Sequence, residues 1–230
     1  MNLYAIGDFH LSLSGEKPMN IFGEKWEGHE EKILKGFESV REDDVTVICG
    51  DLSWETGTNN TLGDFRFLEA LPGKKILLKG NHDYWWTTRK KLGEFFSENN
   101  IMSVDILHNN FFEFGDYAIC GTRGWFFEEE TGTPHDEKIM NREIGRLKVS
   151  LESAGDRKKL VFLHYPPIYR DYRCEGILNL LKEHEVRLCC YGHIHGKGCY
   201  SALNGWINGT NFKLVSADYV NFKPILLDLY

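Results

Sequence analysis

The stretch Ile76-Leu77-Leu78-Lys79-Gly80-Asn81-His82-Asp83 joins a short apolar run to side chains that can bind a metal. Four other runs follow the same design: Leu3–Ile6 before Gly7-Asp8-Phe9-His10, Val45–Cys49 before Gly50-Asp51, Leu160–Leu163 before His164, and Leu188–Tyr191 before Gly192-His193-Ile194-His195. Apolar runs of this length are typical of buried β-strands. Because open α/β sheets bind ligands beyond the carboxyl ends of their strands, we expect the five ends to converge on one site.

Helical periodicity between these runs predicts an α/β fold. The expected helices carry four apolar stripes, which are Ile33/Leu34/Phe37/Val40, Leu92/Phe95/Phe96, Met140/Ile144/Leu147/Leu151 and Ile177/Leu178/Leu181. We expect Asp136 to cap the third helix. Residues 111–120 and 198–230 instead indicate short strands joined by turns, with a hairpin at Asn204-Gly205. This mixture predicts two packed sheets with helices outside both.

The composition is that of a soluble protein. The 230 residues are 42% hydrophobic and 27% charged. No run approaches the roughly 18 to 20 apolar residues that a membrane span needs. We expect one domain over residues 1–230, since ligands from Asp8 to His195 must meet in one site. Because the sequence enters a strand pattern at its first residues, we expect no signal peptide, and its six cysteines lack a Cys-x-x-Cys spacing. A cytoplasmic location and buried, reduced cysteines are therefore expected.

The charge of the chain bears on its partners. A formal net charge of -7 opposes non-specific attraction to nucleic acid, which depends on many Lys and Arg contacts to phosphate. Two bound divalent cations would reverse the sign of the potential inside a pocket, so an anionic ligand remains compatible with this charge. We therefore expect neither a nucleic acid polymer nor a membrane as a partner, and a small anionic substrate is compatible with the charge. The sequence indicates no protein partner.

The residue types at the strand ends suit two metal ions. Asp8 and His10 are two apart, so in extended geometry both side chains project to one side and one metal could bind both. The carboxylate of Asp51 has two oxygens and can bridge two cations. Asn81 offers a neutral amide oxygen, and the His193-x-His195 spacing could give one nitrogen to each ion. Mn, Fe and Zn all accept such ligands.

In order, the motifs Asp-x-His, Gly-Asp, Gly-Asn-His-Asp, a strand-end His and Gly-His-x-His resemble those of the calcineurin-like metallophosphoesterase superfamily. The resemblance covers nearly the whole chain. It implies a four-layer α-β-β-α sandwich with two mixed central sheets, the metallo-dependent phosphatase-like fold. It also implies one metal held by Asp8, His10, Asp51 and His195, and another held by Asp51, Asn81, His164 and His193. His82 matches the family's catalytic histidine, which binds no metal. Asp83 is a candidate to position it, and a helix cap or a role in support of the metal ligands is an equal alternative.

Metal-ion chemistry then suggests a reaction. Two cations about 3.5 to 4 Å apart share a water whose pKa falls toward neutrality, which gives a hydroxide nucleophile near pH 7. His82 is expected to donate a proton to the departing oxygen or to stabilise its charge. These roles predict a phosphohydrolase for a phosphomonoester or phosphodiester. The alternatives are a nuclease, which needs a basic groove, a dimetal amidase or peptidase, and a metal-binding scaffold without catalysis.

The second motif departs from the Gly-Asp-x-x-Asp-Arg-Gly of protein Ser/Thr phosphatases, because Trp54 and Glu55 stand where Asp and Arg would be. Protein phosphatase activity is therefore disfavoured. Arg123 becomes the candidate for binding the substrate phosphate through its guanidinium fork. It lies in the irregular segment 121–135, which we expect to be an active-site loop or lid. Trp85, Trp86, Trp125 and Phe126 could form an aromatic wall for a flat leaving group, although core packing is the favoured interpretation of such large aromatic residues.

Overall fold

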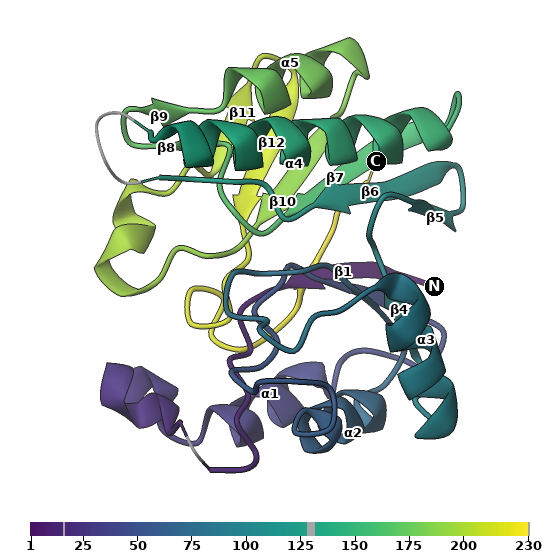
Figure 1. Ribbon diagram of the computed structural model, residues 1–230, viewed down its shortest axis with the longest axis vertical. Helices are drawn as coiled ribbons and strands as arrows, with labels where there is room; N and C mark the ends of the chain where they lie inside the picture. Colours follow the sequence, from purple (N-terminus) through teal and green to yellow (C-terminus); the bar gives the residue numbers. More distant parts are fainter. Residues whose placement is uncertain (16, 128–131, 230) are drawn as a thin grey trace.

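Four layers make up the molecule. The computed structural model describes residues 1–15, 17–127 and 132–229. Two β-sheets pack face to face, and helices cover the outer face of each (Figure 1). Each sheet contains both parallel and antiparallel strand pairs. The expected α-β-β-α sandwich with two mixed sheets is confirmed.

The first sheet has the strand order β13-β1-β2-β3-β4. Its strands are β1 (Leu3–Ile6), β2 (Val45–Ile48), β3 (Lys74–Leu77), β4 (Val104–Ile106) and β13 (Ile225–Leu226). All neighbouring pairs are parallel except β1 with β13. The accompanying helices are α1 (His29–Phe37), α2 (Leu62–Ala70) and α3 (Arg89–Glu98), with the 3-10 helices η1 (Met19–Phe22) and η2 (Glu24–Trp26).

The second sheet has the strand order β11-β12-β10-β7-β6-β5. Its strands are β5 (Phe111–Phe114), β6 (Tyr117–Thr122), β7 (Lys158–Leu163), β10 (Leu188–Tyr191), β11 (Gly205–Ile207) and β12 (Thr210–Leu214). Helices α4 (Pro134–Ser153) and α5 (Glu175–Glu183) lie over its outer face (Figure 1). The remaining elements are the small hairpin β8 (Ile168–Tyr169) and β9 (Tyr172–Arg173), and the 3-10 helix η3 (Gly196–Ser201).

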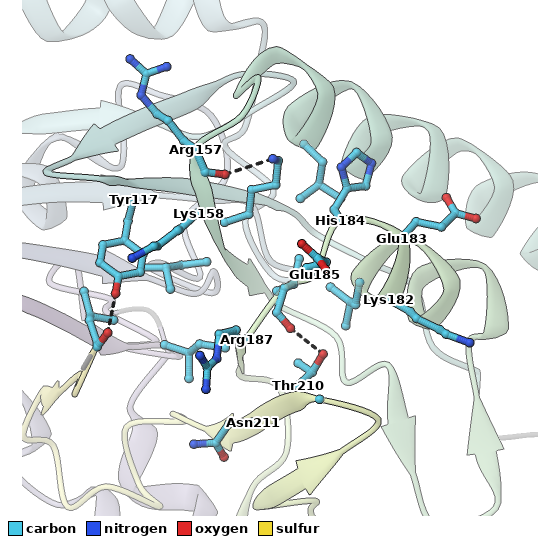
Figure 2. Close-up of a pocket in the computed structure, with 18 of the residues that line it drawn as sticks. Tyr117, Arg157, Lys158, Lys182, Glu183, His184, Glu185, Arg187, Thr210 and Asn211 are labelled. Atoms are coloured by element: carbon cyan, nitrogen blue, oxygen red, sulfur yellow. Dashed lines mark hydrogen bonds between the residues drawn. The ribbon is translucent and has the colours of Figure 1, made fainter.

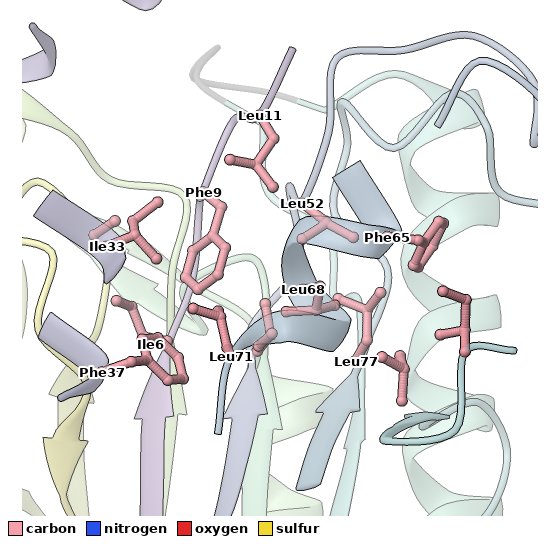
Figure 3. Close-up of a cluster of buried hydrophobic side chains, with 14 of the residues drawn as sticks. Ile6, Phe9, Leu11, Ile33, Phe37, Leu52, Phe65, Leu68, Leu71 and Leu77 are labelled. Atoms are coloured by element: carbon pink, nitrogen blue, oxygen red, sulfur yellow. The ribbon is translucent and has the colours of Figure 1, made fainter. Parts of the chain in front are cut away.

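Three hydrophobic cores join the four layers, one between the sheets and one under each helical layer. Strand β7 shows how one run serves two cores, since Leu160 and Phe162 face the other sheet while Val161 and Leu163 face the helices. Successive strand residues point to opposite faces, so a strand buried on both sides has to be apolar throughout. Figure 3 shows the core under the first sheet, where Phe9 lies among side chains of α1 and α2.

The cysteines pack as expected. All six are free, and five of them are buried. In β10, Cys189 joins the outer core and Cys190 joins the core between the sheets. Neither cysteine therefore lies at the end of the strand where the metal ligands were expected. In the part of the chain that the structure describes, no helix is both long and apolar enough to cross a membrane.

Two local expectations were wrong. The closing hairpin pairs β11 with β12, and Ile207 faces Thr210, so its turn is Asn208-Gly209 rather than Asn204-Gly205. Helix α4 is capped by Thr133, whose side chain accepts a hydrogen bond from the Asp136 backbone N–H while the Asp136 carboxylate accepts one from Thr133 N. Asp136 is thus the third residue of the helix in a capping box, not the cap itself.

The segment 121–135 was expected to be an active-site loop or lid. Its first residues complete β6, and Pro134 begins α4. Residues 128–131 of this segment lie outside the described residues, so the proposed lid stays a prediction. Helix α2 was not expected from the sequence. Its Phe65 and Leu68 are buried against the first sheet.

Candidate metal centre

The side chains that follow β1, β2, β3, β7 and β10 come together at one end of the two sheets. These strands run parallel within their sheets, so their carboxyl ends lie at a common edge. The residues brought together are Asp8, His10, Asp51, Asn81, His164, His193 and His195. All of the expected metal ligands are therefore neighbours in the folded protein.

One group of donor atoms gathers around His195. Its Nε2 lies 3.4 Å from Nε2 of His10 and 3.5 Å from Oδ1 of Asp8. Oδ2 of Asp51 lies 3.8 Å from the same nitrogen of His10. Atoms that share one small cation are close neighbours of each other, and these distances fit such an arrangement.

A second group gathers around Asn81. Its Oδ1 lies 2.7 Å from Nε2 of His164 and 3.0 Å from Nδ1 of His193. Oδ2 of Asp51 lies 3.5 Å from that nitrogen of His164. The same carboxylate oxygen therefore lies within 4 Å of a ring nitrogen in each group. This is the position that a bridging ligand would need.

The charges and protonation states of the site fit a pair of cations. Burial and the neighbouring carboxylate of Asp8 raise the pKa of Asp51 well above its usual range, so two buried acids repel each other here. Burial also lowers the pKa of His10 well below 6.5, and burial together with His164 lowers that of His193 to about 3. Neutral imidazoles are the form that binds metals. The site thus offers carboxylates that need positive charge and, at His10 and His193, neutral rings with lone pairs to share.

Two of the histidines are oriented by hydrogen bonds on their other ring nitrogen. Nδ1 of His164 lies 2.9 Å from the carbonyl oxygen of Cys49, which leaves Nε2 to bind a metal. Nδ1 of His195 lies 2.8 Å from Oδ1 of Asp218, whose other oxygen accepts a hydrogen bond from Gly196 N. Although burial opposes the charged form, the carboxylates of Asp8 and Asp218 raise the pKa of His195 to about 10. Outer partners of this kind fix the tautomer of metal-binding histidines.

Asp218 was missed by the sequence analysis. It follows β12, which runs parallel to β10, so it too lies beyond the carboxyl end of a parallel strand. The signal was the apolar run Phe212-Lys213-Leu214-Val215 a few residues before an acid. It was overlooked because residues 198–230 were expected to form only short strands and turns.

The backbone at the site adopts an unusual conformation. Four of the expected ligands have positive φ, namely Asp8 (60°), His10 (50°), Asp51 (52°) and His193 (72°). Residues with side chains rarely adopt this left-handed region, and such strain is concentrated at functional sites. Sharp turns directly after the strands aim these side chains at one another. Hydrogen bonds within the site hold these turns in place.

Glycines allow the carboxylates to approach the backbone. A Cβ atom on Gly80 would lie 2.0 Å from Oδ1 of Asp51, and one on Gly192 would lie 2.5 Å from Oδ2 of Asp8. Both distances are far below van der Waals contact. The Gly-Asn-His-Asp and Gly-His-x-His motifs therefore need glycine at these positions for steric reasons.

Asp83 ties together two loops of the site. Its Oδ2 accepts hydrogen bonds from the backbone N–H groups of Asp51 (2.9 Å) and Gly80 (2.7 Å), and its Oδ1 accepts from Leu52 N (2.9 Å) and from Trp85 Nε1 (3.1 Å). The side chain is fully buried. These contacts favour support of the loops that carry Asp51 and Asn81 over direct positioning of His82, and a catalytic role of Asp83 stays a prediction.

His82 lies beside the donor cluster. Its backbone N–H donates to Oδ1 of Asp51 at 2.8 Å. The ring packs against Trp54, with centroids 4.0 Å apart, and Nδ1 lies 3.4 Å from the hydroxyl of Tyr84. Burial and the nearby His164 lower the pKa of His82 to about 4. Its place next to the ligands, but outside both groups, fits a residue that acts on substrate.

Arg123 holds the loop after β7. Its carbonyl oxygen accepts hydrogen bonds from the backbone N–H groups of His164 (3.1 Å) and Tyr165 (2.9 Å). The guanidinium is 15% exposed, lies 3.7 Å from Oε1 of Glu143 and stacks 5.0 Å from the ring of Trp125. Its Nε is buried without a partner among the described residues. Substrate binding by Arg123 stays a prediction.

Two of the four residues considered for an aromatic wall pack in the core, as the sequence favoured. Trp85 is buried in the core against Phe65, with ring centroids 5.0 Å apart. Phe126 is also buried and packs on Tyr172. Core packing, the favoured interpretation, therefore applies to both residues.

A groove of about 1200 Å³ lies away from this centre. It opens at the amino-terminal ends of β6, β7, β10 and β12, the opposite end of the strands from the donor cluster. Figure 2 shows that its walls carry both signs of charge, from Arg157, Lys158, Lys182, Glu183, Glu185 and Arg187. A mixed lining of this kind selects no class of ligand.

Comparison with known proteins agrees with this geometry. The family model for calcineurin-like phosphoesterases matches residues 1–197. The chain has no significant match among curated proteins.

Three solved structures share the fold. The phosphopantetheinyl hydrolase PptH from Mycobacterium tuberculosis is 14% identical with a TM-score of 0.63, and the match covers 99% of this chain and 96% of that one. TT1561 of Thermus thermophilus is 14% identical with a TM-score of 0.57 over 99% and 98% of the two chains. AQ665 from Aquifex aeolicus, titled a protein of unknown function, is 19% identical with a TM-score of 0.54 over 98% and 95%.

Proposed function

Because the chain belongs to the calcineurin-like phosphoesterase family, we propose that it is a phosphohydrolase that uses two divalent metal ions to cleave a phosphomonoester or phosphodiester. The observation that carries the proposal is the position of Asp51. One of its carboxylate oxygens lies 3.8 Å from His10 Nε2 and 3.5 Å from His164 Nε2, between the two donor groups. A single bound ion would not need a ligand in that position.

Asp8, His10, Asp51 and His195 would hold one ion, and Asp51, Asn81, His164 and His193 would hold the other. When bound, such ions polarise phosphoryl oxygens and lower the pKa of water toward neutrality. Mn, Fe and Zn all suit this mixture of carboxylate, imidazole and amide donors. The family match is the reason to choose phosphorus over an amide carbon as the electrophile.

His82 is the candidate for the leaving-group side of the reaction. Its ring faces the site without belonging to either donor group, and Trp54 restricts its rotation. A bound phosphoester brings negative charge next to the imidazole, which favours the protonated form and raises the pKa of His82 from its low value in the ligand-free protein. The protonated ring can then donate to the departing oxygen.

The test is an assay of the purified protein with 4-nitrophenyl phosphate and bis(4-nitrophenyl) phosphate. We expect turnover of at least one ester after removal of metals with EDTA and reconstitution with Mn²⁺, and none in the metal-free protein. His82→Ala should keep two bound metals, measured by mass spectrometry of the elements, and lose about 100-fold or more in kcat. Loss of metal from this variant would show that its role is structural.

The same assay separates the competing functions. Failure to cleave either ester, with two metals bound, would favour a non-catalytic scaffold or a dimetal amidase. Cleavage of single-stranded or duplex DNA at rates above those for the small esters would favour a nuclease. The net charge of -7 opposes that outcome. We propose a small phosphorylated substrate for this reason.

A further inference from the structure

An exposed apolar surface lies next to His82. Ile21 and Phe22, at the end of η1, are 71% and 60% exposed, and Tyr84 is 57% exposed. Large apolar side chains grouped at the surface mark binding sites more often than scattered ones do. Figure 1 shows η1 as part of the short purple turns that stand away from the layers.

Ring contacts connect this surface to the reacting residue. Phe22 stacks nearly parallel to Trp54, with centroids 6.3 Å apart and planes 5° apart. Trp54 in turn lies 4.0 Å from the ring of His82. On another side of His82, the ring of Tyr84 is 6.0 Å away in an edge-to-face arrangement. Phe22 is therefore connected to His82 through Trp54, and Tyr84 contacts His82 directly.

The indole of Trp54 itself is already covered. His10 stacks on it at 5.0 Å, and the ammonium of Lys17 lies 4.7 Å from its ring centre. Its Nε1 donates to Sδ of Met19 at 3.1 Å. Trp54 thus acts as the fixed base of the surface, and the exposed rings of Phe22 and Tyr84 remain for a ligand.

We propose that Ile21, Phe22 and Tyr84 form a binding surface for the leaving group of the substrate, and that this leaving group is an apolar alcohol with an alkyl or aryl body. The proposal rests on the function proposed above, since it assigns the leaving group to the His82 side. A sugar or a peptide hydroxyl would place polar groups against these side chains, and such contacts contribute little binding free energy. An alkyl chain or ring would remove apolar surface from water on both partners.

The test uses a series of alkyl phosphates with ethyl, butyl and hexyl groups, assayed by release of inorganic phosphate in the Mn²⁺-loaded protein. Their alcohols have similar acidity, so the series varies leaving-group size with little change in intrinsic reactivity. We expect kcat/KM to rise at least tenfold from ethyl to hexyl. The double variant Ile21→Ser/Phe22→Ser should reduce the hexyl-to-ethyl ratio to near one. Both side chains are exposed, so these substitutions leave the core intact.

Met102→Ser is the matched control. Met102 is 78% exposed and lies after α3, where its backbone N–H donates to Glu69. The substitution therefore removes a similarly exposed apolar side chain from another part of the surface. Its hexyl-to-ethyl ratio should equal that of the wild type. Reduction of the ratio by Met102→Ser as well would show a general effect of surface polarity and overturn the proposal.

Other outcomes separate this inference from the proposed function. Turnover of ethyl phosphate with a flat series would overturn the apolar surface and leave the phosphohydrolase in place. If no member is cleaved, the Kd of each alkyl phosphate for the metal-loaded wild type is measured by calorimetry instead. Equal Kd values across the series would overturn the proposed apolar surface. A dimer that dissociates in Ile21→Ser/Phe22→Ser, together with a flat series, would assign the surface to self-association instead.

Discussion

The ring of Trp54 packs against the ring of His82 with 4.0 Å between their centroids. Both oxygens of the Asp83 carboxylate accept hydrogen bonds from backbone N–H groups, so this carboxylate is engaged away from the His82 ring. Aromatic packing from one side and the Tyr84 hydroxyl at 3.4 Å from Nδ1 therefore restrict the imidazole.

Replacement of Trp54 tests this positioning role. Trp54→Ala should lower kcat by about 10- to 100-fold, because a misplaced reacting group is costly even when its chemistry is intact. Trp54→Phe keeps a ring against His82 and should restore most of the activity. Metal content should be the same in both variants. Equal kcat in the alanine variant and the wild type would show that His82 needs no support from the indole.

The hydrogen bond between Asp218 and His195 predicts an effect on metal affinity. Asp218→Asn removes the charge that faces Nδ1 of His195, and we expect the affinity for one of two metals to fall about 10- to 100-fold. Competition with a fluorescent chelator measures both affinities. Asp116→Asn, at an exposed position after β5, is the control for loss of one surface charge. Unchanged affinity in Asp218→Asn would remove this residue from the metal centre.

The donor cluster could be predicted because its signals are local. Each ligand follows a strand whose last residues are buried and largely apolar, as in β10 and in the second half of β7. A polar residue after such a run stands out. Parallel pairing brings the strand ends within each sheet to one edge. Contacts between the sheets, such as the hydrogen bond from Gly7 N to the carbonyl oxygen of Val215, then bring the edges that carry Asp8 and His195 together.

Other features depend on tertiary contacts that no local pattern contains. Asn204-Gly205 and Asn208-Gly209 are identical dipeptides, and only the pairing of β11 with β12 decides which one forms the turn. Asp83 looks like part of a catalytic motif, yet its partners include the backbone of Leu52, far away in sequence. The contact between Trp54 and Phe22 likewise joins two irregular segments.

The glycine of the Gly-His-x-His motif predicts a steric effect. Gly192→Ala would place its Cβ 2.5 Å from Oδ2 of Asp8, a carboxylate held by two contacts of 3.1 Å to His193 N. Asp8 must move, so we expect metal affinity to fall at least tenfold. Gly93→Ala is the control, because its Cβ meets no described atom within 4 Å and alanine favours helix α3. Full metal retention by Gly192→Ala after gel filtration would contradict this account.

Lys75 in β3 predicts a dependence of stability on pH that is separate from the metal centre. Its side chain is fully buried, and Nζ donates to the carbonyl oxygens of Leu71 (2.6 Å) and Gly73 (2.8 Å). Burial lowers the pKa of Lys75 from 10.5 to about 8. Between these pH values the unfolded chain binds more protons at this site than the folded protein does. The free energy of unfolding should therefore rise with pH across this window, by at most about 3 kcal/mol from this residue.

Urea denaturation at pH 7.5 and pH 10 measures this effect when wild type and Lys75→Met are compared. Methionine does not titrate, so the variant should lack the gain that the wild type shows between the two pH values. Other groups, such as tyrosines and cysteines, titrate in both proteins and cancel in the difference. The variant also leaves two carbonyl oxygens without their donor, which lowers stability at both pH values alike. Parallel pH profiles would mean that Lys75 reaches water in the folded protein and keeps its ordinary pKa.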